Sequence, residues 1–367
     1  MPSPRVIISG GGTGGHIFPA IAIANAIKEQ APKAEILFVG AQGRMEMEKV
    51  PAAGFPIEGL WISGFQRSLS LKNLMFPIKL LQSLRAAKKI IKKFKPDLVI
   101  GTGGYASGPV LRVATKMKIP TLIQEQNSYA GITNKILGKS VNKVCVAFEN
   151  MDRFFPAVKI ILTGNPVRKT VIEIEGKRQK ALDFFGLTSD KKTILIIGGS
   201  LGAKSVNDAI LPQINRFVDE GVQLIWQTGK VSYDDVAEGT KSLKNKGIKV
   251  HQFIADMDLA YAAADLVISR AGAIAVTEIV LTKKPTILVP LPSAAEDHQT
   301  KNALALTQHD AAILVSNAQA ASLLTEKALE LVKDEEELKK LSENIEPFGL
   351  PNSAEIIAAE ALKLTNI

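Results

Sequence analysis

The chain has 367 residues, of which 46% are hydrophobic and 22% charged, a balance that excludes an intrinsically disordered protein and predicts two compact domains. Its net charge of +9 is unevenly placed: residues 1–164 carry 22 Lys and Arg against 9 Asp and Glu, whereas the remainder carries 23 against 27. The basic first half predicts a phosphate-rich partner, either nucleic acid or an anionic membrane surface.

The N-terminus runs directly into the apolar segment Val6–Ser9, without the hydrophobic core of a signal peptide. No uncharged apolar run is long enough to span a bilayer, so we expect a cytoplasmic protein. The single cysteine, Cys145, lies in an apolar run and predicts a buried, unreactive thiol.

Short apolar runs alternate with longer amphipathic stretches in the first half, which is the pattern of a parallel sheet with crossover helices. A doubly wound domain is therefore expected. Its strands are predicted at 6–9, 36–39, 98–100 and 121–123, and its helices near 17–29, 72–94 and 106–117.

The same pattern restarts after the turn at 163–166, with strands predicted at 193–197, 222–226, 249–253, 266–269 and 286–289. The residues from Pro351 onward resemble the start of a capped helix. We expect an N-terminal domain over 1–164, a C-terminal domain over 165–345, and a last segment, 346–367, that packs back on the first domain.

Three expected strands run into glycine clusters, at 10–15, 101–104 and 198–202. Glycine lets the backbone turn tightly and approach a ligand, and the helix that follows directs free N–H groups at it. Ligands of open α/β sheets bind beyond the carboxyl ends of the strands, where these clusters fall. Each cluster is a candidate anion site, with strand-to-helix packing as the alternative.

The first cluster matches the dinucleotide pattern G-x-G-x-x-G at Gly10, Gly12 and Gly15. That pattern expects an acidic residue at the end of the second strand, where this chain has Gly40–Gln42, so a dehydrogenase is disfavoured. A nucleoside triphosphatase loop is excluded, because His16 stands where its lysine would be.

His16 begins the helix beside this cluster. A helix N-terminus disfavours the imidazolium form and leaves a neutral ring that can accept a proton. His16 is therefore a candidate general base, and a purely structural hydrogen bond is the alternative.

Polar side chains also follow the expected strands. The run Gln124–Asn127 suits recognition of sugar hydroxyls, and the Glu278 carboxylate could accept both hydroxyls of a ribose. Glu278 and Gln299 could instead lie on solvent-exposed helix faces.

Asp256 and Asp258 form a D-x-D pair of the kind found in metal-dependent glycosyltransferases. They precede an expected helix, so we interpret the pair as a helix cap. No metal site is expected.

Nine Lys and Arg and no acidic residue lie between Leu60 and Pro96, interleaved with apolar side chains. This composition predicts that residues 65–95, approximately, contact an anionic membrane surface, with an ordinary solvated helix face as the alternative. Nucleic acid is disfavoured, because aromatic residues for base stacking are few.

Several motifs, in order over most of the chain, resemble the MurG family of N-acetylglucosaminyltransferases, which convert lipid I to lipid II in peptidoglycan synthesis. They are Gly11–Ala20, Gly101–Pro109, Glu125–Asn127, Gly164–Arg168, Gly198–Ser200, Arg270–Ala273 and Glu278. The chain departs from the usual family pattern at Leu201 and within Asp297–Lys301.

The resemblance implies a GT-B fold, with two Rossmann-like domains facing a cleft. It implies that UDP-N-acetylglucosamine binds mainly to the second domain and lipid I, an undecaprenyl-diphosphate muramoyl-pentapeptide, to the first. It further implies inverting transfer to the muramoyl 4-hydroxyl, without metal or cofactor, by a peripheral protein at the cytoplasmic face of the inner membrane.

Residue roles follow from motif position. His16 would be the catalytic base, with Glu125 as the next candidate. Glu278 would hold the ribose, Ser200 the diphosphate and Arg168 the nucleoside. The other donor-binding residues implied are Thr13, Gly14, Gly15, Asn127, Ile254, Ala273 and Gln299. The acceptor-binding residues implied are Gly14, Gly15, Gly103, Gly104 and Tyr105.

Three other functions stay open on the residues themselves. The first is a GT-B transferase with a different donor or lipid acceptor, such as a diacylglycerol glycosyltransferase. The second is an epimerase acting on the same sugar nucleotide, and the third is a binding protein without catalytic activity.

Overall fold

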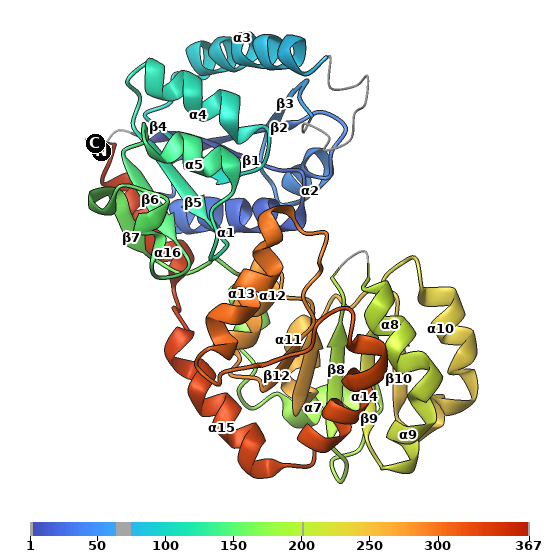
Figure 1. The fold of residues 1–367 in the computed structure, drawn as a ribbon. Coiled ribbons are helices and arrows are strands. Elements are labelled where there is room, and N and C mark those ends of the chain that lie inside the picture. The colour runs from blue at the N-terminus through green and yellow to red at the C-terminus, as the bar shows by residue number, and fades with distance from the viewer. Residues whose placement is uncertain (1–2, 64–74, 200–201, 366–367) are drawn as a thin grey trace. The chain divides into compact units, whose positions relative to one another are not determined.

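A computed structural model describes residues 3–63, 75–199 and 202–365. They form two α/β units, each with its own parallel sheet (Figure 1). The first unit is Met1–Val167 together with Leu350–Ile367, and the second is Arg168–Gly349. Both chain ends thus belong to the first unit, and the expected boundary after residue 164 lies beside the observed one.

The described sheet of the first unit runs in the order β3-β2-β1-β4-β5-β6-β7, with parallel neighbours throughout. Both faces are buried, because Ile7 packs into one hydrophobic cluster while Val6 and Ile8 pack into another. A sheet buried on both faces needs helices on both. Its strands are β1 (Arg5–Gly10), β2 (Glu35–Ala41), β3 (Ile57–Leu60), β4 (Leu98–Gly103), β5 (Thr121–Glu125), β6 (Lys143–Val146) and β7 (Ile160–Leu162).

Helices of the first unit divide between these two faces. Ala87 of α3 and Val110 of α4 belong to the cluster of Ile7, whereas Ile23 of α1 and Ile357 of α16 share the other cluster. The last helix of the chain therefore packs beside the first (Figure 1). The helices are α1 (Gly14–Gln30), α2 (Glu46–Ala52), α3 (Phe76–Phe94), α4 (Ser107–Lys116), α5 (Ile132–Gly138) and α16 (Ser353–Leu362).

The second unit repeats this construction around a described sheet in the order β10-β9-β8-β11-β12-β13, again with parallel neighbours. Its strands are β8 (Thr193–Ile197), β9 (Gln223–Gln227), β10 (Ile248–His251), β11 (Leu266–Ser269), β12 (Thr286–Leu288) and β13 (Ile313–Leu314). Helices α8 (Lys204–Ile210), α9 (Ile214–Asp219), α14 (Ala320–Leu331) and α15 (Glu335–Ile345) contribute to the cluster on one face. Helices α7 (Arg178–Phe185), α11 (Met257–Ala263), α12 (Ala273–Leu281) and α13 (His298–Thr307) contribute to the other. The remaining helices are α6 (Lys169–Ile172) and α10 (Tyr233–Gly239).

These two doubly wound units confirm the predicted fold class, and each predicted strand is present. Four strands lie outside the predicted ranges: β3, β6, β7 and β13, with two to four residues each. β3 contains a glutamate and a glycine among its four residues and β13 has only two residues, so neither forms a clear apolar run.

Strand order reverses at one position in each sheet, between β1 and β4 in the first and between β8 and β11 in the second. The connections leaving neighbouring strands there go to opposite faces, which opens a crevice at the carboxyl edge. The turn at 10–15 follows β1 and that at 198–202 follows β8. Two of the predicted glycine turns thus lie at the switch points of their own sheets.

Candidate active site

The turns after β1 and β4 pack directly on each other at the switch point of the first unit. A Cβ atom on Gly103 would lie 2.8 Å from Nδ1 of His16, and one on Gly104 would collide with the Gly11 carbonyl. Gly103 and Gly104 also have φ angles of 97° and 83°, in the region that favours glycine. Close packing and backbone conformation therefore explain why both positions are glycine, without any need for a bound ligand.

His16 is the third residue of α1 and lies beside Gln126, which follows β5. Its Nδ1 is 3.0 Å from Oε1 of Gln126. The Gln126 amide nitrogen donates to the Thr102 carbonyl at 2.7 Å and to the side chain of Gln124, which fixes Oε1 as the atom facing the ring. Nδ1 of a neutral His16 must then carry the proton, which places the ring's lone pair on Nε2.

A buried amide network holds Gln126 in this orientation. Gln124 donates to Oδ1 of Asn165 at 2.9 Å, and Asn165 donates to the Gln126 carbonyl at 3.0 Å. All three side chains are buried. The interpretation of Gln124 and Gln126 as sugar-binding side chains is therefore wrong, because their amides bond within the protein.

Glu125 is a buried carboxylate that organises the loop between β5 and α5. It accepts hydrogen bonds from the backbone and side-chain nitrogens of Asn127 at 3.1 and 3.2 Å. It also accepts from the Gly131 N–H at 3.0 Å and from Nδ2 of Asn134 at 2.9 Å. Four donors on one carboxylate hold Asn127 and the start of α5 in fixed positions.

A second buried carboxylate, Glu46, lies under the first glycine turn and was not singled out from the sequence. It accepts hydrogen bonds from the N–H groups of Gly12 at 3.0 Å and Ala41 at 2.9 Å. No local pattern marks it, because the surrounding segment 44–49 is rich in charged residues and looks like a solvent-exposed helix face.

The remaining predicted residues of the first unit are exposed or half-buried. Thr13 is the N-cap residue of α1 and is exposed, and Gly14 and Gly15 form the first turn of that helix. Tyr105 follows Gly104 and is 53% exposed. The open side of the turns therefore carries Thr13, both helical glycines and an aromatic ring.

In the second unit the turn after β8 is tightly built. A Cβ atom on Gly202 would collide with the Thr228 carbonyl, whereas one on Gly199 would meet nothing within 4 Å. Gly199 faces open space with a φ of 78°. Ser200, predicted to hold the diphosphate, lies outside the described residues.

Arg270 follows β11 and is buried beside the start of α8. Its guanidinium donates to the carbonyls of Val289 and Pro290 at 2.9 and 3.2 Å, to Oδ1 of Asn317 at 2.9 Å and to Oγ of Ser205 at 2.8 Å. Burial lowers the pKa of Arg270. A cation thus joins the end of β12 to the first turn of α8, which the motif alone did not indicate.

Glu278 lies on α12, where Tyr261 of α11 donates a hydrogen bond of 3.1 Å to its carboxylate. Burial raises the pKa of Glu278 to about 7, while the Tyr261 hydroxyl and the charge of Arg168 act in the opposite direction. The structure therefore brings Glu278 close to Arg168. By resemblance, these two residues would bind neighbouring parts of the donor, the ribose and the nucleoside. The alternative of an exposed Glu278 is wrong.

The other predicted residues of the second unit lie near the carboxyl edge of its sheet. Ile254 is buried, and its N–H donates to Oε1 of Gln227 at 2.9 Å. Ala273 is the first residue of α12, and Gln299 accepts from the Leu291 N–H at 2.9 Å. Beside Ile254, Phe253 is 62% exposed, an aromatic side chain that no motif in the sequence marks.

The D-x-D pair matches the expected helix cap in position but not in hydrogen bonding. Asp256 is the N-cap residue of α11, but its side chain makes no capping hydrogen bond, because its φ and ψ of −89° and 66° lie outside the extended conformation of N-cap residues. Asp258 instead forms an ion pair of 2.8 Å with Lys177. Within the described ranges, no three His, Cys, Asp or Glu side chains group as metal ligands would.

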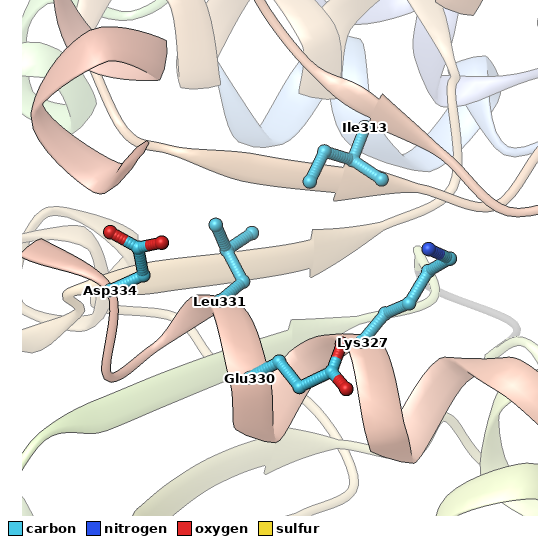
Figure 2. A pocket seen from close by; sticks show the side chains of 5 residues that line it. All are labelled: Ile313, Lys327, Glu330, Leu331 and Asp334. Carbon is cyan, nitrogen blue, oxygen red and sulfur yellow. The ribbon is translucent and has the colours of Figure 1, made fainter. Parts of the chain in front are cut away.

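A separate pocket in the second unit is lined by Ile313, Lys327, Glu330, Leu331 and Asp334 (Figure 2). It lies where β13 begins and α14 ends, at the amino ends of the parallel strands, whereas the glycine turn lies at their carboxyl ends. Ligands of such sheets bind at the other edge, so this pocket is not part of the candidate site.

Helix α3 carries the described part of the basic stretch. Arg85, Lys88, Lys89, Lys92 and Lys93 are exposed along it. Near its start, Ile78 and Leu81 are 47% and 56% exposed, and Nζ of Lys79 lies 5.3 Å from the centre of the Trp61 ring. Arg67 and Lys72 fall outside the described residues, among which no helix is both long and apolar enough to cross a membrane.

Comparison with known families gives two matches that together span most of the chain. Residues 6–146 match the glycosyltransferase family 28 N-terminal domain, and residues 193–356 match the glycosyltransferase family 28 C-terminal domain.

Curated relatives share about half of their residues with this chain. One from Christiangramia forsetii is 52% identical over 99% of this chain and 98% of its own length. Another from Phocaeicola vulgatus is 55% identical over 99% of this chain and 96% of its own. Both are named UDP-N-acetylglucosamine–N-acetylmuramyl-(pentapeptide) pyrophosphoryl-undecaprenol N-acetylglucosamine transferase.

Solved structures share the fold. MurG from Acinetobacter baumannii superimposes with a TM-score of 0.76 at 29% identity, covering 98% of this chain and 99% of that one. A UDP-GlcNAc 2-epimerase from Neisseria meningitidis, bound to UDP-GlcNAc, gives 0.66 at 16% identity, covering 99% of this chain and 100% of that one. The second likeness concerns the fold alone.

Proposed function

The chain belongs to glycosyltransferase family 28, and from that premise we propose that it transfers N-acetylglucosamine from UDP-N-acetylglucosamine to lipid I, giving lipid II. The observation that carries this is identity of 52–55% over nearly the whole length of relatives named for that reaction. The acceptor would be the 4-hydroxyl of the muramoyl sugar, attacked on the donor with inversion.

His16 is the proposed general base. The Gln126 contact supports this role, because it keeps the proton on Nδ1 and thereby leaves the basic lone pair on Nε2. A neutral imidazole held in one tautomer can take the proton of an attacking hydroxyl. Gly14 and Gly15 would supply N–H groups to the acceptor diphosphate, with Gly103, Gly104 and Tyr105 beside them.

Glu125 is better suited to positioning than to proton transfer. Its carboxylate accepts four hydrogen bonds, and moving it toward a substrate hydroxyl would break the contacts to Asn127, Gly131 and Asn134. We assign it the role of presenting Asn127 to the sugar.

The donor would bind at the switch point of the second unit. Glu278 would accept the ribose hydroxyls and Arg168 would contact the nucleoside, while Ser200 and the free N–H groups at the start of α12 would face the diphosphate. Negative charge on the departing UDP would be stabilised by helix N-termini, with the buried cation of Arg270 behind them. Thr13, Asn127, Ile254, Ala273 and Gln299 complete the proposed donor contacts.

The membrane-facing surface is proposed to be α3 and the residues before it. Exposed apolar side chains at one end and a row of lysines along the helix match an anionic lipid surface, where each basic residue contributes about 1 kcal/mol. We therefore place the protein at the cytoplasmic face of the inner membrane, as a peripheral protein that meets its lipid substrate there.

A donor panel tests the reaction. Purified full-length protein is incubated with a lipid I analogue and either UDP-N-acetylglucosamine, UDP-N-acetylgalactosamine or UDP-glucose, and the disaccharide product is quantified. We expect turnover mainly with the first donor. The proposal fails if that donor neither binds nor reacts, and formation of the 2-epimer from donor alone would favour an epimerase instead.

A further inference from the structure

We propose that Glu46 is a positioning residue for the acceptor: its carboxylate fills the inner anion position of the first glycine turn and thereby directs the acceptor diphosphate to the first N–H groups of α1. The inference rests on the proposed function, because it concerns how that same site holds its substrate.

The position of Glu46 follows from the way β1 leaves the sheet. Ser9 pairs with Val39, so a continued β1 would bring Gly11 opposite Ala41. The chain turns away after Gly10, and the fully buried Glu46 carboxylate takes up the vacated place. One oxygen accepts from the Ala41 N–H and the other from the Gly12 N–H, so the side chain joins β2 to the departing turn.

Two glycines make room for this one carboxylate. A Cβ atom on Gly11 would collide with it, and one on Gly40 would come within 2.5 Å of Cγ of Glu46. Gly15 differs, because its Cβ would meet only Oγ1 of Thr13 at 3.7 Å. The inner glycines are thus required by Glu46, whereas the outer glycine lies where a ligand can approach.

This arrangement explains why a turn that matches the dinucleotide pattern need not bind a dinucleotide. In that fold the glycine-rich turn lets a pyrophosphate approach its backbone closely. Here the Gly12 N–H is already bound by a carboxylate, whose charge repels a second anion at that depth. The donors left for a diphosphate are those of the first turn of α1, at Gly14 and Gly15, directly before His16.

A carboxylate suits this position better than an amide. Two N–H groups donate to the two oxygens, and a carboxylate offers an acceptor oxygen to each. Glutamine has the same shape, but its NH2 group would face one of the two N–H donors. Glu46→Gln should therefore keep the packing and release one of the two bonds, which loosens the turn.

The test compares Glu46→Gln with Glu48→Gln, an exposed change on the same helix. Steady-state kinetics of the full-length enzyme are measured with UDP-N-acetylglucosamine and a lipid I analogue, together with the Kd for UDP. We expect Glu46→Gln to raise the acceptor KM about tenfold and lower kcat severalfold. Donor KM and UDP affinity should stay within about twofold, and Glu48→Gln should behave as wild type.

Gly11→Ala reaches the same carboxylate from the opposite side and should give the same separation between acceptor and donor KM if Glu46→Gln folds poorly. An unchanged or lowered acceptor KM in a folded variant overturns the inference, as does an equal rise in both KM values. Turnover by the wild-type enzyme tests the proposed function separately. If the wild type does not react, the proposed function fails, whatever the variants do.

Discussion

Nδ1 of His16 and Oε1 of Gln126 lie 3.0 Å apart, although 110 positions separate the two residues in the chain. The Gln126 amide is itself oriented by the Thr102 carbonyl and the Gln124 side chain, so its oxygen can only accept. This contact fixes the tautomer of His16, with the proton on Nδ1 and the lone pair on Nε2.

Replacing His16 with alanine should lower kcat by about 100-fold or more, because proton removal from the attacking hydroxyl would lose its base. UDP affinity should be unchanged, since the donor is expected to bind the second unit. Steady-state kinetics and calorimetric titration with UDP measure the two quantities. His309→Ala, an exposed histidine of the second unit, serves as the control. Near-normal turnover of His16→Ala would remove His16 as the base.

Glu125→Gln should lower kcat less than His16→Ala does, by roughly tenfold, because glutamine keeps one acceptor but loses part of the hold on Asn127 and Gly131. The acid limb of the pH–rate profile should stay where it is in the wild type, because the titrating base is unchanged. If that limb disappears in Glu125→Gln, then Glu125 is the base and the assignment of His16 is wrong.

UDP affinity should depend on pH through Glu278. Burial raises the pKa of this carboxyl to about 7, so lowering the pH through 7 protonates it and removes an acceptor for the ribose hydroxyls. We expect Kd for UDP to rise roughly threefold to tenfold between pH 8 and pH 6. Titration calorimetry at several pH values measures this.

Glu278→Gln provides the control, because its affinity should be weaker but nearly independent of pH over the same range. The same carboxyl predicts the sign of a stability effect. Its folded pKa lies above the ordinary value of 4.5, so the folded state binds the extra proton and loses stability as pH rises from 4.5 through about 7. Glu278→Gln should therefore melt at a higher temperature than wild type at pH 8, and a lower melting temperature would contradict this.

Charge reversal along α3 tests the membrane surface. Changing Lys88, Lys89, Lys92 and Lys93 to glutamate should weaken binding to vesicles containing anionic lipid by at least 100-fold at low salt, because each lysine contributes about 1 kcal/mol. Vesicle sedimentation measures the binding. The matched control reverses four exposed lysines of the second unit, Lys241, Lys244, Lys246 and Lys339. Equal loss in both variants would refute a specific surface on α3.

The two α/β units, the glycine turns and the family could all be predicted from the amino-acid sequence. Apolar runs of four to seven residues mark the longer strands, and the β-branched run Thr193–Ile197 predicts a buried strand. The motifs around His16 and Glu278 are also local, so the family resemblance could be recognised without knowledge of the fold, although the burial of Glu278 could not.

Which side chains contact one another could not be predicted in this way, because it depends on how the strands are ordered in the folded unit. Glu46 bonds the Gly12 N–H 34 positions away because β2 lies beside β1. Gln126 bonds His16 because β1 and β5 both lie beside β4, the central strand of the sheet. Hydrophobic periodicity reports which face of a strand is buried but not which strand is its neighbour. Strand order is set by the packing of the whole unit. It places the carboxylate of Glu46 and the ring of His16 at the glycine turn.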